Sequence, residues 1–447
     1  MNYRETTEYL DSLNGLGSRP GLENISELLT RLGNPQNKVR AVHIAGTNGK
    51  GSVGAFLTSV LTMAGYRIGR YCSPAVFDPL ETISFNGVNI SEDDFARVIT
   101  DTVSVCDENL CPTRFEIETA AAFMFFDRMK CDIAIVECGM GGELDATNVM
   151  SDVICSVITP VSMDHMSFLG DTIEKIAECK AGIIKPGVDV AAYKDERYSS
   201  VLTERAMQTK SDIYYIDDEN IICNTGNNEL VFSYRGYKDI RLNTPAAYQA
   251  VNGAIALEVV DRLRNKGYNL TDDIIRAGMY NMKWPGRFEI LNDNKRMLIL
   301  DGAHNPAGAA AFADSYRRLY GDEKSVIILA MFKDKDTRGV LEHIMPLADS
   351  VITTMAPDNP RSFPAKDLAE YIKKYYDIEV GYEADIYKAV SLAFDMAGEN
   401  KVIACGSLAH LALVKEAYRK YGQRKAARRP PVARTAFARS TTQFPQP

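Results

Sequence analysis

Residues 46–52, with the sequence GTNGKGS, are of the types that bind phosphate. Glycines let backbone N–H groups approach phosphate oxygens, Lys50 supplies a cation for the outer phosphates, and a helix starting near Ser52 adds its positive end. The usual phosphate-loop pattern has more residues between its glycines than Gly46 and Gly49 have here. A tight turn with an incidental lysine is the alternative, but so many glycines beside a lysine and a serine favour a nucleotide site. We predict that the nucleotide is bound by Thr47, Asn48, Gly49, Lys50, Gly51 and Ser52.

Acidic and basic side chains follow two further apolar runs. Glu137 ends the run CDIAIVECG, where a buried carboxylate needs a cation or a donor. It fits either a Mg²⁺ ligand or one half of a structural ion pair, and the residues alone leave both open. Asp164 and His165 follow the run VICSVITPV, and Lys180 lies in the apolar helical stretch AECKAGIIKPG. Taken alone, Lys180 is typical of a surface or capping residue.

The last third of the chain adds two more candidates. Arg287, in WPGRFE, carries a guanidinium that could reach phosphates held elsewhere in the protein. Asp301 and His304, in LILDGAHNPAGA, end another apolar run and suggest a ligand face. A turn-forming aspartate followed by an ordinary Asn-Pro helix start explains the same residues equally well.

The elements that position these residues alternate along the chain. Short apolar strands are expected at 41–45, 131–139 and 153–161, with helices at 52–64 and 116–129 between them. A second set of strands is expected at 297–304, 325–332, 349–356 and 401–407. This order predicts an α/β protein, with a phosphate loop and parallel sheet in a larger N-terminal domain and a smaller Rossmann-like C-terminal domain. The Pro-Gly pair at 285–286 divides them into residues 1–286 and 287–422, and residues 423–447 form a basic tail that we expect to be disordered.

Composition narrows the class of protein. The chain of 447 residues is 46% hydrophobic and has a net charge of −8, which does not favour nucleic acid or an acidic membrane surface. We find neither a membrane-length apolar run nor a signal-peptide pattern. The nine cysteines form no CxxC pair and suggest reduced thiols in a cytoplasmic protein, which we expect to be a monomer without nucleic-acid or membrane partners. The tail alone leaves a nucleic-acid-binding arm as an alternative.

Together the motifs resemble the folylpolyglutamate synthases and the bifunctional dihydrofolate synthase/folylpolyglutamate synthases. These are Mur-ligase-like enzymes that use ATP to form amide bonds. The similarity extends from about residue 2 to about residue 418. It is carried by HIAGTNGKGS, YCSPAVFDPLETI, FEIETAAAF, ECGMGGELDATN, DHMSFLGDTIEKIAECKAGIIK, YQAVNGAIAL, WPGRFE, LDGAHNPAGA and ACGSLAHLA.

The resemblance implies a role for each matching residue. The loop around residues 48–52 would bind the phosphates of ATP, with Lys50 on the outer ones. Asn252 would face adenine, and Arg287 and Asp301 would contact ATP from the second domain. Lys180 matches a lysine that becomes N-carboxylated in this superfamily, which would turn a cation into a metal-binding carboxylate. Two Mg²⁺ ions are implied, as are a pteroate or folate acceptor and L-glutamate as substrates. The implied metal ligands are Ser73, Glu137, His165 and Lys180, and the implied catalytic residues are Lys50, Lys180, His165 and His304.

The chain departs from the family pattern at three places. Relatives commonly have histidine where this chain has Ala75, and arginine where it has Thr82, both in the loop expected near the pterin. They often have arginine at Glu143. The differences at Ala75 and Thr82 leave the acceptor open between dihydropteroate and a folate that already carries glutamate, and no consequence is assigned to Glu143. A muramyl-peptide ligase and a P-loop ATPase or switch module remain the alternative functions.

Overall fold

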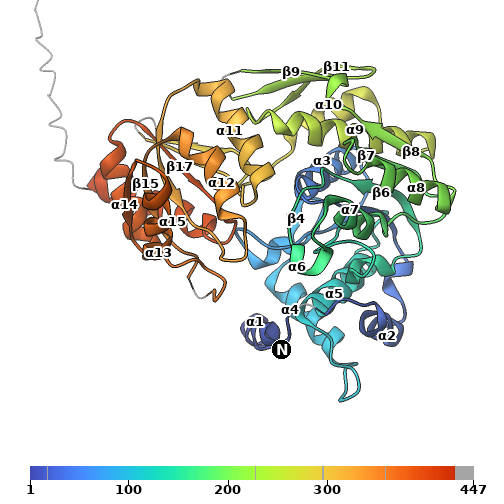
Figure 1. The fold of residues 1–447 in the computed structure, drawn as a ribbon. Helices are drawn as coiled ribbons and strands as arrows, with labels where there is room; N and C mark the ends of the chain where they lie inside the picture. The colour runs from blue at the N-terminus through green and yellow to red at the C-terminus, as the bar shows by residue number, and fades with distance from the viewer. Residues whose placement is uncertain (18, 227, 294–295, 358, 428–447) are drawn as a thin grey trace, which may run out of the picture.

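A computed structural model describes residues 1–447 except 18, 227, 294–295, 358 and 428–447. The chain forms two α/β domains that lie side by side, the first coloured blue to yellow and the second orange to red in Figure 1. Each is built around a mostly parallel sheet, which confirms the predicted fold class. Within the described residues, no helix has both the length and the apolar character needed to cross a membrane.

The phosphate loop follows a central strand of the first sheet. This strand, β1, lies between β5 and β6 and runs parallel to both. Only β3 and β4 at one edge run antiparallel to their neighbours. In spatial order the strands are β4 (Val88–Asn89), β3 (Ile83–Phe85), β2 (Ile68–Tyr71), β5 (Ile133–Glu137), β1 (Arg40–Ala45), β6 (Val153–Ile158), β7 (Val190–Tyr193) and β8 (Ile213–Ile216).

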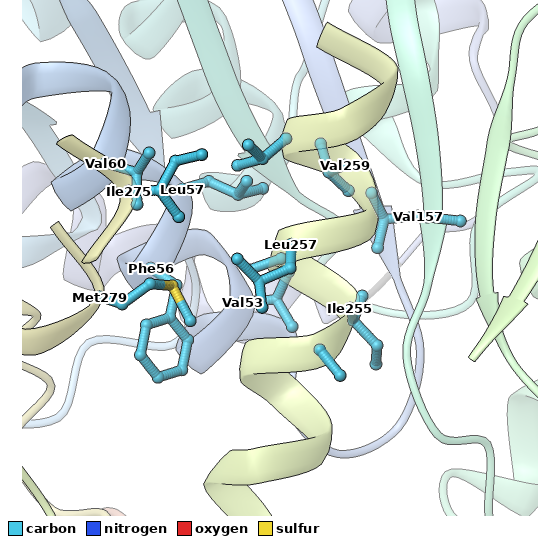
Figure 2. Close-up of a cluster of buried hydrophobic side chains, with 14 of the residues drawn as sticks. Val53, Phe56, Leu57, Val60, Val157, Ile255, Leu257, Val259, Ile275 and Met279 are labelled. Carbon is cyan, nitrogen blue, oxygen red and sulfur yellow. The ribbon is translucent and has the colours of Figure 1, made fainter. Parts of the chain in front are cut away.

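Helix α3 (Lys50–Met63), which begins at the phosphate loop, lies deep in the domain. Its side chains pack against α9 (Tyr248–Asn265), α10 (Asp272–Asn281) and the sheet, as the buried side chains of Figure 2 show. Fully buried Phe56 and Met279 meet at this contact. The helix is therefore held by its apolar side chains, so that its first turn has a fixed position. The remaining helices of the domain are α1 (Tyr3–Ser12), α2 (Glu23–Arg31), α4 (Glu92–Val103), α5 (Arg114–Arg128), α6 (Met166–Leu169), α7 (Ile173–Ala181) and α8 (Ser199–Thr209).

Between β8 and α9 in the sequence, the chain forms a three-stranded antiparallel sheet. It consists of β9 (Ile221–Thr225), β10 (Leu230–Tyr234) and β11 (Tyr237–Leu242), which pair in the order β11-β10-β9. Buried Leu230 and Phe232 of β10 belong to the same apolar cluster as α3 and α9. The sequence analysis did not predict this sheet.

The C-terminal domain has a six-stranded sheet with one antiparallel edge strand, β12. In spatial order its strands are β12 (Glu289–Asn292), β13 (Met297–Leu300), β17 (Lys401–Cys405), β14 (Ser325–Leu329), β15 (Ala348–Thr353) and β16 (Glu379–Tyr382). Its helices are α11 (Pro306–Tyr320), α12 (Thr337–Ile344), α13 (Ala365–Tyr375), α14 (Ile386–Ala397) and α15 (Leu411–Ala427).

Predicted and observed boundaries differ mainly at the ends of elements. The strand expected at 131–139 ends at Glu137, because the chain leaves the sheet there to line the site. Helix α15 extends to Ala427, so residues 423–427 are helical and the prediction that they belong to a disordered tail was wrong. The rest of that tail, 428–447, lies outside the described residues.

Candidate active site between the two domains

The phosphate loop needs glycine at two positions. Gly46 has φ 146° and Gly49 has φ 94°, a backbone region that side chains rarely adopt. A Cβ atom at Gly46 would lie 1.8 Å from Thr159 Oγ1, and one at Gly49 would lie 2.3 Å from Asn252 Oδ1. The loop therefore packs directly against β6 and α9, with its N–H groups at the start of α3.

Two lysines converge on one carbonyl oxygen of this loop. Lys50 Nζ lies 3.2 Å from Gly46 O, and Lys180 Nζ lies 2.8 Å from the same atom. Lys180 is 3% exposed, and its burial together with the charge of Lys50 lowers its pKa to about 7. A substantial fraction of Lys180 is thus a neutral amine near pH 7, which is the form that reacts with carbon dioxide.

Glu137 ends β5 beside Lys50. Its carboxylate forms an ion pair with Lys50 Nζ at 3.8 Å. Burial raises its pKa, while the charges of Lys50, Arg70 and Arg287 oppose that rise. A second cation would compensate a carboxylate placed in this way, so Glu137 is suited to bind a metal ion.

The residues predicted as metal ligands line the same cavity: Ser73, Glu137, His165 and Lys180. The described residues contain no cluster of three or more His, Cys, Asp or Glu side chains that could hold a metal. Glu137 and Ser73 nevertheless offer the oxygen atoms that Mg²⁺ prefers, and burial lowers the pKa of His165 to about 4, so its imidazole is neutral. The donor set fits Mg²⁺ through its oxygens, and Lys180 would join it only as a carbamate.

Asp301 is already surrounded by donors from the protein. Its carboxylate accepts hydrogen bonds from Tyr248 Oη at 2.7 Å, from the Phe288 N–H at 2.9 Å and from the Ala303 N–H at 2.8 Å. These bonds fix the turn that carries Arg287 into the cavity. Asn252 is likewise held, since its side chain donates to Gln249 Oε1 at 2.8 Å.

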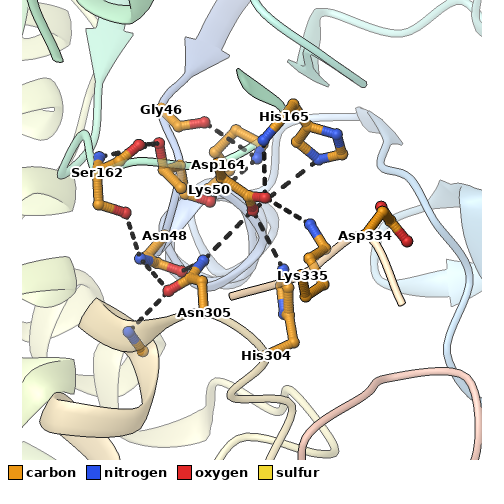
Figure 3. A network of polar contacts seen from close by, with 12 residues as sticks. Gly46, Asn48, Lys50, Ser162, Asp164, His165, His304, Asn305, Asp334 and Lys335 are labelled. Carbon is orange, nitrogen blue, oxygen red and sulfur yellow. Dashed lines mark hydrogen bonds and ion pairs between the residues drawn. The ribbon is translucent and has the colours of Figure 1, made fainter. Parts of the chain in front are cut away.

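A polar network joins the two domains over the phosphate loop, as Figure 3 shows. The side-chain amides of Asn48 and Asn305 exchange hydrogen bonds of 3.2 and 3.1 Å. Asp164 Oδ1 accepts a hydrogen bond of 2.5 Å from Lys335 Nζ, and Asp164 Oδ2 lies 3.5 Å from His304 Nε2. Although burial opposes it, the hydrogen bond from His304 and the charge of Lys335 hold the pKa of Asp164 well below its usual range.

We predict that Asp164→Asn destabilises the protein by about 3 kcal/mol, because Lys335 then keeps a buried charge without its counter-ion. The side chains of Lys335 and Asp164 are 7% and 9% exposed. The measurement is the free energy of unfolding in urea. Since the pKa of Asp164 is lowered, the pair contributes fully above the usual aspartate pKa, and its contribution is lost as the pH falls.

The matched control is Asp334→Asn, in the loop between β14 and α12 that also carries Lys335. Asp334 pairs with Arg361, and both side chains are about half exposed, so this change is expected to cost less than ~1 kcal/mol. Equal losses from the two variants would contradict a buried link between the domains.

All the site residues predicted from the sequence line one cavity of about 390 Å³ between the domains. The sequence analysis did not identify Lys335, which lies in the loop after β14, as a site residue. It also missed Tyr248, Arg70 and Trp284. Tyr248 and Trp284 begin the quoted stretches YQAVNGAIAL and WPGRFE, and Arg70 lies outside every quoted stretch. The sequence did not assign these three a role, because their positions depend on packing around the phosphate loop.

A phosphate-loop domain whose cavity is completed by cations of a second α/β domain defines the ATP-dependent ligases of the Mur type. The Mur ligase middle domain matches residues 44–260, and the Mur ligase glutamate ligase domain matches residues 286–408. A dihydrofolate synthase/folylpolyglutamate synthase from Bacillus subtilis is 33% identical over 383 residues, which cover 82% of this chain and 88% of that protein. The chain therefore belongs to the dihydrofolate synthase/folylpolyglutamate synthase family.

Solved structures of this family are similar to the chain over most of its length. The Mycobacterium tuberculosis folylpolyglutamate synthase complexed with ADP and AMPPCP is 30% identical, with a TM-score of 0.85 over 94% of this chain and 98% of that chain. Escherichia coli FolC in complex with DHPP and ADP is 28% identical, with a TM-score of 0.82 over 93% and 98%. The chain is an ATP-dependent ligase of this family.

Proposed function

We propose that the protein adds L-glutamate to dihydropteroate and to folates that already carry glutamate. The observation that carries this proposal is the shared cavity, where Lys50, Glu137 and Lys180 of one domain face Arg287 and His304 of the other. Transfer to a second substrate, shielded from water, explains that arrangement.

The reaction requires activation of a carboxylate. The carboxylate oxygen of the acceptor attacks the γ-phosphorus of ATP, the bond to the β-phosphate oxygen breaks, and ADP leaves. The amine of glutamate then attacks the acyl carbon, loses a proton, and expels inorganic phosphate as the amide forms. Lys50, Arg287 and the loop N–H groups neutralise the charge that develops on the transferring phosphoryl group. Mg²⁺, held by Glu137, Ser73 and His165 with an N-carboxylated Lys180, would add charge neutralisation at the phosphates.

The choice of acceptor concerns the loop at residues 75–82. Here the carboxylate of Glu81 accepts hydrogen bonds from the backbone N–H groups of Val76 and Phe77. These bonds give the loop a fixed shape. The FolC relative was solved with DHPP and ADP, and the Bacillus relative carries both activity names. These relatives support both acceptors for this chain. A muramyl peptide is the less favoured acceptor.

The test is ADP release measured with dihydropteroate and with a reduced folate in parallel, each with and without glutamate. We expect sustained release only when an acceptor and glutamate are both present, and products heavier by one glutamyl residue in mass analysis. Release that needs neither substrate would indicate an ATPase. Release that requires only a muramyl peptide would indicate the other branch of the Mur ligases.

We also propose that the enzyme is a cytoplasmic monomer that binds no nucleic acid. The nine cysteines, all within the described residues, are free thiols, which suits a reducing compartment. Size-exclusion chromatography with light scattering tests the monomer, and salt-dependent binding to nucleic acid would contradict the last part.

A further inference from the structure

The single tryptophan of the chain lies where the two domains join. Trp284 follows α10 and precedes the Pro285–Gly286 pair, after which the chain enters β12 of the second domain. Gly286 has φ 72°, a conformation that favours glycine at a turn. Trp284 lines the site cavity together with Gly51 and Arg287. The indole thus belongs to the connection between the domains and also to the wall of the nucleotide site.

The indole occupies the space that a side chain at position 51 would fill. A Cβ atom on Gly51 would lie 2.9 Å from Trp284 Cζ2 and 3.0 Å from Trp284 Nε1. Contacts this short do not occur in packed proteins, so the ring rests directly on the backbone of the phosphate loop. The ring is therefore in direct contact with the first turn of α3.

Arg70, on β2, links the indole to the same loop residue. Its Cζ lies 3.9 Å from the centre of the Trp284 ring, and its Nη2 donates to Gly51 O at 2.7 Å. Arg70 is 7% exposed, so the guanidinium is held between ring and carbonyl away from most of the solvent. Stacking on tryptophan is among the stronger cation–π contacts. Among the described residues, the buried indole N–H finds no hydrogen-bond acceptor, so packing and this cation position the ring.

We propose that Trp284 is a positioning residue that couples the connection between the domains to the phosphate loop. Its indole fixes the backbone of Gly51 from one side and keeps Arg70 on the Gly51 carbonyl, so that the loop N–H groups are set for the nucleotide when the domains close. This inference rests on the proposed function, because it concerns nucleotide binding in the same site. It assigns a role to a residue outside the sequence-predicted site.

The first test uses the wild-type protein, in which all tryptophan emission comes from Trp284. AMPPCP with Mg²⁺ is titrated while emission is recorded, and binding is measured independently by calorimetry. We expect the emission to change as AMPPCP is added, with the same midpoint concentration as the binding curve measured by calorimetry. Binding without any change in emission would overturn the coupling and leave the proposed function intact. Absence of calorimetric binding would overturn both.

The second test compares variants by the KM for ATP and the KM for glutamate. Trp284→Ala is expected to raise the KM for ATP about tenfold and to leave the KM for glutamate unchanged. Trp284→Phe keeps a ring on Gly51 and Arg70, so its KM for ATP is expected within about twofold of wild type. Equal effects on both substrates, or no rescue by phenylalanine, would indicate a merely structural role.

A matched control removes a similar contact elsewhere. The Arg262 guanidinium stacks on Tyr214 with 3.7 Å to the ring centre, on the side of α9 that faces β8. Tyr214→Leu should lower the melting temperature and leave the KM for ATP unchanged. A rise in the KM for ATP equal to that of Trp284→Ala would contradict the proposal.

Gly51→Ala provides a further check, since its methyl group competes with the indole. If the two residues act through one contact, the double variant Gly51→Ala/Trp284→Ala raises the KM for ATP no more than the worse single variant. Multiplicative effects would overturn the proposal.

Discussion

Replacing Lys50 with alanine is expected to reduce acceptor- and glutamate-dependent ADP release by about 100-fold or more. Lys50 begins α3, and its ammonium lies 3.2 Å from Gly46 O and 3.8 Å from Glu137. The variant keeps the loop backbone but loses the cation that faces the outer phosphates. Steady-state ADP release, with circular dichroism to confirm folding, is the measurement.

The matched control is Lys175→Ala, since Lys175 is 60% exposed and pairs with Asp171 on the surface. It should retain wild-type turnover. Wild-type turnover in Lys50→Ala would show that another group neutralises the phosphates.

Lys180→Ala is expected to be almost inactive and to regain part of its activity when formate or acetate is added. The variant leaves space beside Gly46 O, which Lys180 Nζ contacts in the wild type, and a small carboxylate can there replace the carbamate that we propose on Lys180. We expect a loss of about 100-fold, comparable with the loss of a charge-stabilising group elsewhere. Activity with and without added formate is the measurement.

Carbamate formation can be followed directly with ¹³C-labelled bicarbonate by NMR. Because the pKa of Lys180 is lowered to about 7, the neutral amine gains population as the pH rises through that value, and the labelled signal should grow with it. Burial also lowers the pKa of Lys185, which does not line the cavity, so Lys185→Ala should keep the signal. A signal that persists in Lys180→Ala would place the carbamate elsewhere.

Much of the fold could be predicted because its strands are short, apolar and bounded by turn residues. The strand expected at 41–45 is β1, Arg40–Ala45, and the helix expected at 52–64 is α3, Lys50–Met63. The sheet of β9, β10 and β11 was missed because its strands are only half buried, with residues such as Ile222 exposed. Their hydrophobic pattern is correspondingly weak.

The site was predicted for a similar reason. Parallel strands bring their carboxyl ends to one edge, so Glu137 and the phosphate loop had to be neighbours once β1 and β5 were adjacent. Lys335 could not be placed in the same way, because the run KDKD is typical of a solvated loop. Its contact with Asp164 depends on how the second domain docks, which neither periodicity nor spacing encodes.

Because the cavity is divided between two domains, its integrity depends on how the domains are placed. Glu137 ends β5, and the loop before Lys50 follows β1, the neighbouring strand of the same sheet. The hydrogen bonds between these strands keep this half of the site together. The second domain contributes Arg287, His304 and Lys335. These three side chains move away from Glu137 and the phosphate loop when the two domains separate. A rigid-body displacement is enough to disassemble the catalytic centre, with no unfolding of either half.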